Sequence, residues 1–227
     1  MALALIGFAL TRVAALDWVT DWEREVSQWF VARSSPTWDT VTMVGSTMAE
    51  TMTCVALLVV CMVVLRWWLR RWRESLALFT ALAGELVIFL AVSALVARER
   101  PEVRHLDAAP PTSSFPSGHT GAAVALYGGL AVVLLRQLPW RRIAAAVAAV
   151  LLLVPVFVGV SRLYRGMHQL TDVAFGAVNG AVWLAIVVAV LLPVVRGPAE
   201  PSPGAVGPPA AARSPMLSRG APPDGAR

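Results

Sequence analysis

The chain has 227 residues, of which 57% are hydrophobic and only 15% are charged, and its mean hydropathy is +0.67. A soluble domain carries about 25% charged residues, so this composition excludes an ordinary soluble domain and favours a membrane protein with several spans. The formal net charge of +5 lies largely in arginine-rich turns between apolar stretches, and we therefore expect no nucleic-acid partner.

A transmembrane helix needs about 20 apolar residues. The stretches that meet this requirement are 43–65, 76–97, 119–136, 143–160 and 173–195. Residues 1–16 are a weaker sixth candidate, because the stretch is short and contains Arg12. A signal peptide would look similar, but no cleavage site of small residues follows. The sequence predicts an all-α, polytopic membrane bundle of about six transmembrane helices.

Residues 17–40 join the first two candidate spans and have an amphipathic pattern. Trp18, Trp22, Val26 and Trp29 recur at helical spacing, with charged residues between them. The pattern indicates a helix lying in the outer membrane interface. A solvated loop with aromatic anchors fits the same residues.

Arginines cluster in two turns, and their positions predict the orientation. The turns after the second and fourth candidate spans contain Arg66, Arg70, Arg71, Arg73, Arg136, Arg141 and Arg142. Cytoplasmic loops carry the excess of Lys and Arg, so both turns are expected in the cytoplasm. The polar segments 98–118 and 161–172 then lie together on the extracytoplasmic side of the plasma membrane.

The last part of the chain differs in composition from the rest. From Gly197 onward it consists mostly of Pro, Gly, Ala and Ser without a hydrophobic period. Such a segment does not bury enough apolar surface to fold. We therefore expect a membrane domain over 1–196 and a disordered cytoplasmic tail over 197–227.

Four side chains inside the predicted spans need an explanation. Glu50 and Glu85 are costly in a membrane, and either a hydrogen bond between helices or a proton path accounts for them. Cys54 and Cys61 lie ~10 Å apart along one predicted helix, too far for a disulfide within it. We expect both cysteines to be buried apolar residues.

The segment Pro116-Ser117-Gly118-His119 opens an apolar helix. Ser117 suits the N-cap, and Gly118 allows a ligand to approach the backbone closely. The free N–H groups and positive end of the helix favour an anion there. His119 is placed to donate a proton to a leaving oxygen, although a capped helix with a histidine facing water explains the same residues.

Arg162, His168 and Asp172 form a second polar group near the start of the last span. His168 and Asp172 are four positions apart, so on a helix they share a face and can form a hydrogen bond. That bond would fix the imidazole tautomer and leave the other nitrogen free as a nucleophile or base. Arg162 carries a planar guanidinium suited to phosphate oxygens. A His-Asp surface pair beside a lipid-facing arginine is the alternative.

Arg98, Arg100 and Arg104 begin the loop that ends at Ser117. Arginines on an outer loop run against the usual charge distribution, and either an anionic ligand or the neighbouring acids of the loop explain them. Three sparse polar clusters on one predicted face favour the ligand. Together they offer a nucleophile, an acid and several cations.

These residues resemble the signature of the type 2 phosphatidic acid phosphatase superfamily, which includes bacterial acid phosphatases and vanadium haloperoxidases. The signature has three parts: Lys-six-Arg-Pro, Pro-Ser-Gly-His, and Ser-Arg-five-His-three-Asp. The second is complete at 116–119. The third is complete in Ser161, Arg162, His168 and Asp172. The first is partial, since Arg100-Pro101 match but Ser93 occupies the lysine position.

The resemblance implies roles for the residues that match. His168 would attack phosphorus and form a phosphohistidine, with Asp172 orienting it, and His119 would protonate the leaving oxygen. The phosphate-binding residues would be Arg100, Ser117, Gly118 and Arg162, with Arg98 covering the charge that Ser93 lacks. No cofactor and no metal are implied.

The sequence thus predicts an integral-membrane lipid phosphatase acting on a membrane lipid from the extracytoplasmic side. Isoprenoid diphosphates and glycerolipid monophosphates fit equally well, and the oligomeric state is open. Two alternatives remain: a lipid-phosphate binding or transport protein weakened by Ser93, and a vanadate-dependent haloperoxidase. The sequence also leaves open whether Tyr164 and Arg165 contact substrate, whereas His105 is expected to be a surface histidine.

Overall fold

The computed structural model of the protein describes residues 1–13 and 17–193, which belong to one compact unit, Met1–Pro193. The elements are α1 (Ala2–Arg12), α2 (Asp17–Val31), α3 (Pro36–Met48), α4 (Thr51–Leu69), α5 (Arg73–Val96), α6 (Gly118–Ala123), η2 (Val124–Gly128), α7 (Gly129–Gln137), α8 (Arg141–Tyr164) and α9 (Leu170–Leu191). The π-helical turn η2 joins α6 and α7 into one continuous helix. The predicted tail over 197–227 lies outside the described residues.

The prediction of an all-α membrane bundle is confirmed. The described helices long and apolar enough to cross a membrane are Thr51–Leu69, Arg73–Val96, Gly118–Gln137, Arg141–Tyr164 and Leu170–Leu191. The weaker candidate at the N-terminus is α1, an apolar helix of 11 residues that is shorter than these spans. Five described helices are therefore long enough to span the membrane, and the predicted count of about six is reached only by adding the shorter α1.

The first predicted span, 43–65, has different boundaries in the structure. The chain turns between α3 and α4, and Glu50 caps the start of α4 in an extended backbone conformation. Glu50 is exposed at this turn and does not lie inside a span, which corrects the sequence-based expectation. Met48 and Ala49 precede Glu50 and Met52 follows it, so the hydrophobic stretch alone does not mark the turn. Tyr127 Oη donates to the Met48 carbonyl at 2.8 Å and satisfies the end of α3.

Helix α2 confirms the helical interpretation of the amphipathic segment and adds an unexpected feature. Its tryptophans Trp18, Trp22 and Trp29 are exposed, whereas Glu23 and Ser27 are buried. The polar side of the helix therefore faces the protein. An outward tryptophan face is what a helix in the membrane interface requires.

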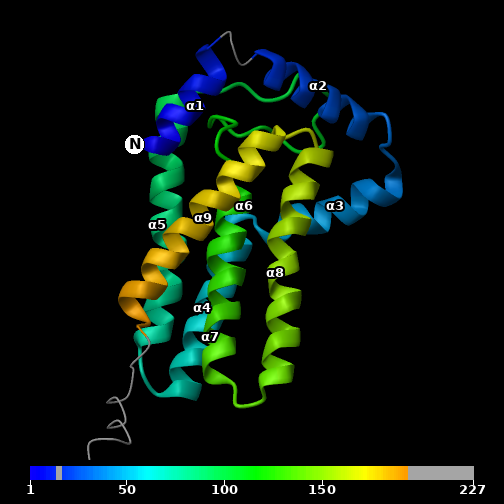
Figure 1. Ribbon diagram of the computed structural model, residues 1–227. Helices are drawn as coiled ribbons and strands as arrows, with labels where there is room; N and C mark the ends of the chain where they lie inside the picture. The colour runs from blue at the N-terminus through cyan, green and yellow to red at the C-terminus, as the bar shows by residue number, and fades with distance from the viewer. Residues whose placement is uncertain (14–16, 194–227) are drawn as a thin grey trace, which may run out of the picture. The chain divides into compact units, whose positions relative to one another are not determined.

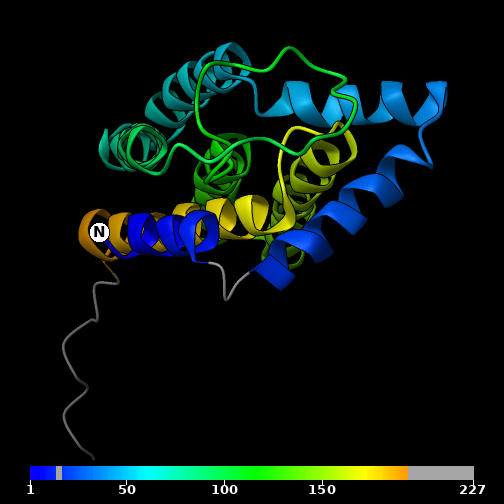
Figure 2. The ribbon, with the colours of Figure 1, turned by 90° about the horizontal axis from the view of Figure 1, so that it is seen from above.

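The long helices run along one another, with different loops at the two ends of the bundle (Figure 1). The turns from α4 to α5 and from α7 to α8 lie together at one end, where Arg71 Nη2 donates to Gln137 Oε1 at 3.1 Å. Helices α1 and α2 and the loop 97–117 lie at the other end. Seen from above, this loop crosses the end of the bundle near the start of α6 (Figure 2). The arginine-rich turns and the polar segments are thus at opposite ends.

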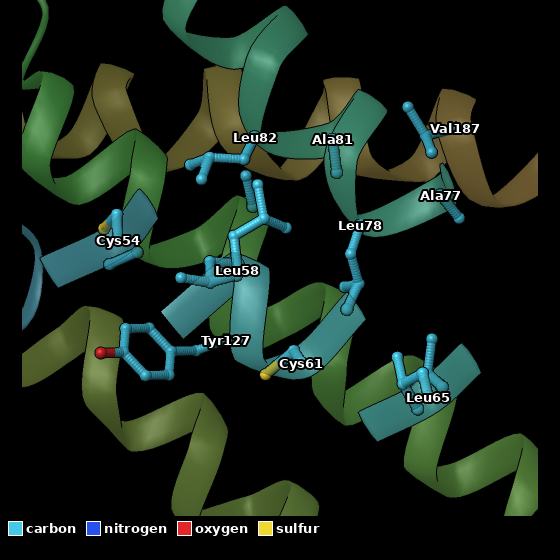
Figure 3. Close-up of a cluster of buried hydrophobic side chains, with 14 of the residues drawn as sticks. Cys54, Leu58, Cys61, Leu65, Ala77, Leu78, Ala81, Leu82, Tyr127 and Val187 are labelled. Carbon is cyan, nitrogen blue, oxygen red and sulfur yellow. The ribbon is translucent and has the colours of Figure 1, made fainter. Parts of the chain in front are cut away.

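The core of the bundle is apolar and draws on all five long spans, and Figure 3 shows part of it. Its buried side chains include Cys54, Leu58, Cys61, Leu65, Ala77, Leu78, Ala81, Leu82, Tyr127 and Val187. Cys54 and Cys61 are free and buried, as predicted. Each fully buried leucine-sized side chain stabilises the fold by about 1.5–3 kcal/mol relative to water, although lipid replaces water around much of this bundle.

Two glycines bring α9 into backbone contact with α6. A Cβ atom on Gly176 would lie 2.4 Å from the Ser117 carbonyl oxygen, and one on Gly180 would lie 2.6 Å from the Gly121 carbonyl oxygen. Small residues at such a crossing let two membrane helices approach closely. The contact brings the first turn of α9 beside Ser117, whose N–H donates to the Asp172 carbonyl at 2.8 Å.

Candidate active site

Three segments that are far apart in the sequence meet at the loop end of the bundle. They are the start of the outer loop after α5, the entry into α6, and the connection from α8 to α9. Ser114 N donates to the Arg98 carbonyl at 2.9 Å and Ser117 N donates to the Asp172 carbonyl at 2.8 Å. The three polar clusters of the sequence therefore form one site.

Ser117 and Gly118 form the predicted helix start. Ser117 is the N-cap of α6, and its buried hydroxyl accepts hydrogen bonds from Thr120 N at 3.5 Å and from Thr120 Oγ1 at 3.0 Å. A Cβ atom on Gly118 would lie 3.0 Å from the ring of Phe89. This close packing requires a small residue at 118 and holds the entry to α6 in place.

The environment of His168 differs from the expected pair on one helix face. His168 lies before α9, because Gln169 is the N-cap of that helix. Its Nδ1 is 2.8 Å from the Ser114 carbonyl oxygen and 3.8 Å from Asp172 Oδ2. A carbonyl only accepts, so Nδ1 carries the hydrogen and a neutral His168 leaves Nε2 free. Burial lowers the pKa of His168, with Asp172 opposing, so the ring is neutral at pH 7.

Asp172 is fully buried and anchors the surrounding segments. Its Oδ2 accepts hydrogen bonds from the backbone N–H of Gln169 at 2.8 Å and from the hydroxyl of Ser114. Its Oδ1 accepts from Arg98 Nη1 at 2.6 Å. The carboxylate thus ties α9, the entry to α6 and the start of the outer loop together. It acts on His168 through its charge and through Ser114, whose carbonyl holds the ring.

Arg98 does not lie where the sequence suggested. Its guanidinium is buried between Asp172 and Glu23, with Nη2 at 2.7 Å from Glu23 Oε2. It also donates to Thr171 Oγ1 at 2.7 Å. Two carboxylates and a hydroxyl occupy its donors, so it supports Asp172 instead of joining the other phosphate-binding candidates. Its spacing of two positions from Arg100 gave no sign that the two side chains diverge.

Five of the predicted site residues line one cavity of about 310 Å³, whereas the buried Ser117, Asp172 and Arg98 do not. Arg100, His119, Arg162 and His168 all contribute to its wall, together with Gly118. The Nε atoms of Arg100 and Arg162 are buried without a hydrogen-bond partner in the described structure. Buried donors of this kind are normally satisfied, so two of them on guanidinium groups beside a cavity mark a place for an anion.

The protein holds Nη1 of each of these two arginines. Arg100 Nη1 donates to the Met167 carbonyl at 2.6 Å. Arg162 Nη1 donates to Asp107 Oδ2 at 2.8 Å and to Ser46 Oγ at 2.6 Å. Burial lowers the pKa of Arg100, with Asp172 opposing, but an arginine stays protonated at neutral pH. Both cations are therefore fixed in orientation before any ligand arrives.

Asp107 is an acid of the outer loop that was not among the predicted site residues. Besides Arg162 it holds Arg165, whose Nη2 lies 2.6 Å from Oδ1. Burial acts to raise the pKa of Asp107, but the hydrogen bond from Arg165 and the charges of both arginines outweigh it and lower the pKa. The carboxylate therefore stays ionised at neutral pH. No spacing in the sequence signals this contact across more than fifty positions.

Tyr164 and Arg165 have structural roles. Tyr164 Oη donates to Asp39 Oδ1 at 2.8 Å, and Arg165 Nη1 donates to the Asp39 carbonyl at 2.9 Å. Both side chains are buried and fasten the end of α8 to α3. His105 is exposed, as predicted, with Nε2 at 2.9 Å from the Pro101 carbonyl oxygen.

The cavity continues from the polar group into an apolar region between α4 and α5. The apolar residues of these two helices that line it are Val55, Leu82, Leu86, Phe89 and Leu90. Val55, Leu86 and Leu90 are among the exposed apolar side chains of the two helices. In a membrane these residues would face lipid, so the cavity joins a polar site to the hydrocarbon region.

Glu85 and Ser93 complete the surroundings of the cavity. Glu85 is buried and accepts a hydrogen bond from Asn179 Nδ2 at 3.5 Å, which is the bond between helices that the sequence offered as one explanation. Ser93 is buried and its hydroxyl accepts from Ser113 N at 3.0 Å. Ser93 therefore supports the outer loop, and it brings no charge to the cavity.

His119 also lines a second cavity of about 330 Å³. The polar residues of its wall are Ser46, Thr47, Glu50, Asp107, His119 and Arg162. This polar space gives water access to His119 from a side other than the apolar region. Within residues 1–13 and 17–193, no group of three or more His, Cys, Asp or Glu side chains is placed to hold a metal ion.

Comparison with known proteins decides the family. Residues 53–195 match the PAP2 superfamily. This region contains all the residues that line the 310 Å³ cavity except Ala49 and Thr51. The chain belongs to the PAP2 superfamily. The resemblance to type 2 phosphatidic acid phosphatases is thereby confirmed. A curated PAP2 relative, phosphatidylglycerophosphatase B of Bacillus subtilis (strain 168), is 39% identical over 67 residues, or 28% of this chain and 32% of that protein.

Solved structures of PAP2 proteins share the fold over most of the chain. The transmembrane PAP2 type phosphatidylglycerolphosphate phosphatase from Bacillus subtilis matches with a TM-score of 0.75 at 23% identity, covering 83% of this chain and 92% of that one. Aquifex aeolicus LpxE matches with a TM-score of 0.58 at 23% identity, covering 73% and 93%. At this identity the matches show the fold, and this chain is accordingly a multi-pass membrane protein of the PAP2 type.

Proposed function

We propose that this PAP2 protein is a lipid phosphatase that hydrolyses a lipid phosphate or an isoprenoid diphosphate through a phosphohistidine. The observation that carries the proposal is the composition of the 310 Å³ cavity. Two arginines with unpartnered, buried Nε–H groups and two histidines line its polar part, and apolar side chains of α4 and α5 line the rest. A lipid phosphate matches both parts, because its anionic head group suits the arginines and its hydrocarbon chain suits the apolar side chains.

In the first step His168 Nε2 attacks phosphorus. A bond from nitrogen to phosphorus forms as the bond from phosphorus to the lipid oxygen breaks, and His119 gives its proton to that oxygen. The products are a lipid alcohol, or a lipid monophosphate from a diphosphate, and phosphohistidine 168. Arg100 and Arg162 stabilise the phosphoryl oxygens, whose charge redistributes in the transition state.

In the second step water replaces the lipid. His119, now neutral, takes a proton from a water molecule, whose oxygen attacks phosphorus while the bond to His168 breaks. Inorganic phosphate leaves, and the two histidines return to their starting states. The polar cavity that also contacts His119 supplies the route for this water. Neither step needs a metal ion.

The position of the site supports a membrane substrate on the extracytoplasmic side. The cavity lies at the opposite end of the bundle from the arginine-rich turns, which the positive-inside rule assigns to the cytoplasm (Figure 1). The exposed side chains Val55, Leu86 and Leu90 at the cavity would let a lipid chain remain among hydrocarbon while its head group binds. The plasma membrane is the expected location.

Phosphate release by the purified full chain in detergent with EDTA tests the proposal. The panel contains an isoprenyl diphosphate, phosphatidic acid and phosphatidylglycerophosphate. We expect release from at least one of them, with His168→Ala reducing it by about a thousand-fold or more, since nucleophile deletions have effects of this size. The matched control is His105→Ala, which changes an exposed histidine outside the cavity and should retain activity.

Vanadate separates the proposal from its alternatives. A phosphohistidine enzyme is inhibited by vanadate, which resembles phosphate in its transition state, whereas a haloperoxidase would require it. Binding of a lipid phosphate without release would instead indicate a binding protein. In that case Ser93→Lys, which introduces the family's lysine, distinguishes an impaired enzyme from a protein that does not turn over.

A further inference from the structure

Glu23 is a buried acid close to the site that the proposed reaction does not use. It lies on α2, 1% exposed, on the side of the helix opposite the tryptophans. A carboxylate removed from water costs several kcal/mol unless it is paired and hydrogen-bonded. Its partners therefore show what it does.

The partners of Glu23 all belong to the site. Its Oε2 lies 2.7 Å from Arg98 Nη2. Its Oε1 accepts from both the backbone N–H and the hydroxyl of Thr171, each at 2.7 Å. Arg98 Nη1 in turn lies 2.6 Å from Asp172 Oδ1. A continuous chain of short contacts runs from α2 through Arg98 to the carboxylate beside His168.

The charges along this chain alternate in sign. Glu23 and Asp172 are the two carboxylates that flank Arg98, and each of the three residues is at most 5% exposed. Without Glu23 the whole charge of Arg98 would act on Asp172 and reduce the negative potential that Asp172 exerts at His168. With Glu23 present, the Glu23–Arg98 pair is neutral and the negative charge of Asp172 remains available.

We propose that Glu23 is a positioning residue of the active site, which holds and neutralises Arg98 so that Asp172 keeps His168 oriented and basic. The meaning of this role for turnover rests on the proposed function, but its effect on His168 does not. It assigns a task to α2, an element outside residues 53–195 that match the family. Helix α2 thus connects the membrane interface to the nucleophile.

Several other charged groups face His168 and must be kept constant in a test. Asp172 faces it from α9, Arg162 from α8, His119 from α6 and Arg100 from the outer loop. Each of these is unchanged by a substitution at 23. Glu25 lies two positions along α2, is exposed, and supplies the matched control.

Histidine NMR of the full chain in detergent tests the inference without turnover. The chain has three histidines, so selective labelling gives three ring signals, and His168→Ala assigns one of them. We expect Glu23→Gln to lower the titration midpoint of His168 by about half a unit or more, as a nearby cation disfavours the charged ring. Glu25→Gln should leave the midpoint unchanged.

Two more variants give opposite and compensating effects. Arg98→Gln removes the cation and should raise the His168 midpoint. The double variant Glu23→Gln/Arg98→Gln removes a neutral pair and should return the midpoint close to the wild-type value. A purely structural role for Glu23 would not produce this reversal. An unchanged midpoint in Glu23→Gln, or a double variant that stays as low as the single one, would overturn the inference.

Kinetics of phosphate release then separate this inference from the proposed function. With the best lipid of the panel, Glu23→Gln should lower kcat about tenfold with little change in KM, as removal of an outer partner commonly does. If the wild type releases no phosphate but the predicted NMR shifts are seen, the proposed phosphatase function is refuted and the positioning role of Glu23 is retained. An active wild type with unchanged kcat in Glu23→Gln would refute the positioning role alone.

Discussion

The two ends of the bundle both contain arginines, which behave in opposite ways. At the end formed by the α4–α5 and α7–α8 turns, Arg71 is half-exposed and pairs with Glu74 beside it in the sequence. Arg73 Nε donates to the Leu191 carbonyl at 2.5 Å, and Arg136 donates to the Leu192 carbonyl. Arg73 and Arg136 thus bind carbonyls at the end of α9 that have no partner within the helix.

At the other end Arg98, Arg162 and Arg165 are buried and organised by acids. Arg162 and Arg165 share Asp107, and Arg98 lies between Glu23 and Asp172. Each acid comes from another part of the chain. Burying a guanidinium is costly, so these partners are needed for the fold, and the donors left over point to an anion as the missing partner. The number of arginines alone does not distinguish the two ends, whereas their burial and their acids do.

The largest expected difference between the ends concerns turnover. Arg162→Gln should lower kcat/KM by about a hundred-fold or more, since one buried donor to a transition-state oxyanion is worth that much. Arg142→Gln, an exposed arginine at the other end, should remain within about twofold. Both are measured as phosphate release from the best lipid of the panel. Equal losses in the two variants would show that the arginines of both ends act only through folding.

Asp107→Asn tests whether an acid organises the phosphate-binding arginines. The variant leaves Arg162 and Arg165 without their shared charge, and we expect a loss of about 2 kcal/mol in unfolding free energy and about tenfold in kcat/KM. Because the folded pKa of Asp107 lies below 3.8, its contribution exists above pH 4 and is lost on acidification below 3.8. The difference in thermal-unfolding midpoint between the wild type and Asp107→Asn should therefore be constant above pH 4 and shrink as the pH falls below 3.8.

The pH dependence of turnover probes the buried nucleophile. An ordinary histidine with a pKa of 6.5 is about three-quarters protonated at pH 6.0, which would reduce activity roughly fourfold. Burial lowers the pKa of His168 below 6.5, so it remains the neutral nucleophile to lower pH. With an aryl phosphate, whose leaving group needs no proton, kcat/KM at pH 6.0 should be less than fourfold below its value at high pH, where the histidine is fully neutral. A fourfold or larger fall would contradict a lowered pKa.

The smallest effect is expected at the other end. Arg71→Gln removes the half-exposed partner of Glu74, which is itself buried. Glu74 keeps its hydrogen bond from Gln137 Nε2 at 3.2 Å, so we expect a loss of about 1 kcal/mol, between the values for exposed and for buried pairs. We expect a small decrease in the midpoint of thermal unfolding and unchanged phosphate release. A decrease in kcat would mean that the two ends are coupled along the spans.

Local patterns in the sequence were sufficient for the spans and for most of the cavity. Hydrophobic length predicted the long helices, and the order of the motifs identified Arg100, His119, Arg162 and His168, which share a wall. The break at Glu50 was missed because Met48, Ala49 and Met52 around it fit an uninterrupted span, and neither Gly nor Pro lies at the turn itself. Spacing also suggested a His168–Asp172 hydrogen bond, whereas α9 begins two residues after His168, at Leu170, and the Ser114 carbonyl accepts from the ring instead.

The supporting acids could not be predicted, because their contacts are long-range. Glu23 meets Thr171 across 148 positions, and Asp107 meets Arg162 across 55. On α2 a buried glutamate looks the same in the sequence as a solvated one such as Glu25. Only the packing of the tryptophan face outward reveals which side of the helix is buried, and that depends on the bilayer as the solvent.

The acceptor for His168 Nδ1–H is a main-chain carbonyl, and this affects how the site tolerates mutation. Exchanging the side chain at 114 removes the hydroxyl that reaches Asp172 but leaves the carbonyl in place. The path of the loop thus determines the tautomer of His168. A substitution at position 114 does not remove the carbonyl that accepts the Nδ1–H bond. A library that randomises Ser114 would sample the strength of the Asp172 contact while every member keeps its nucleophilic nitrogen free.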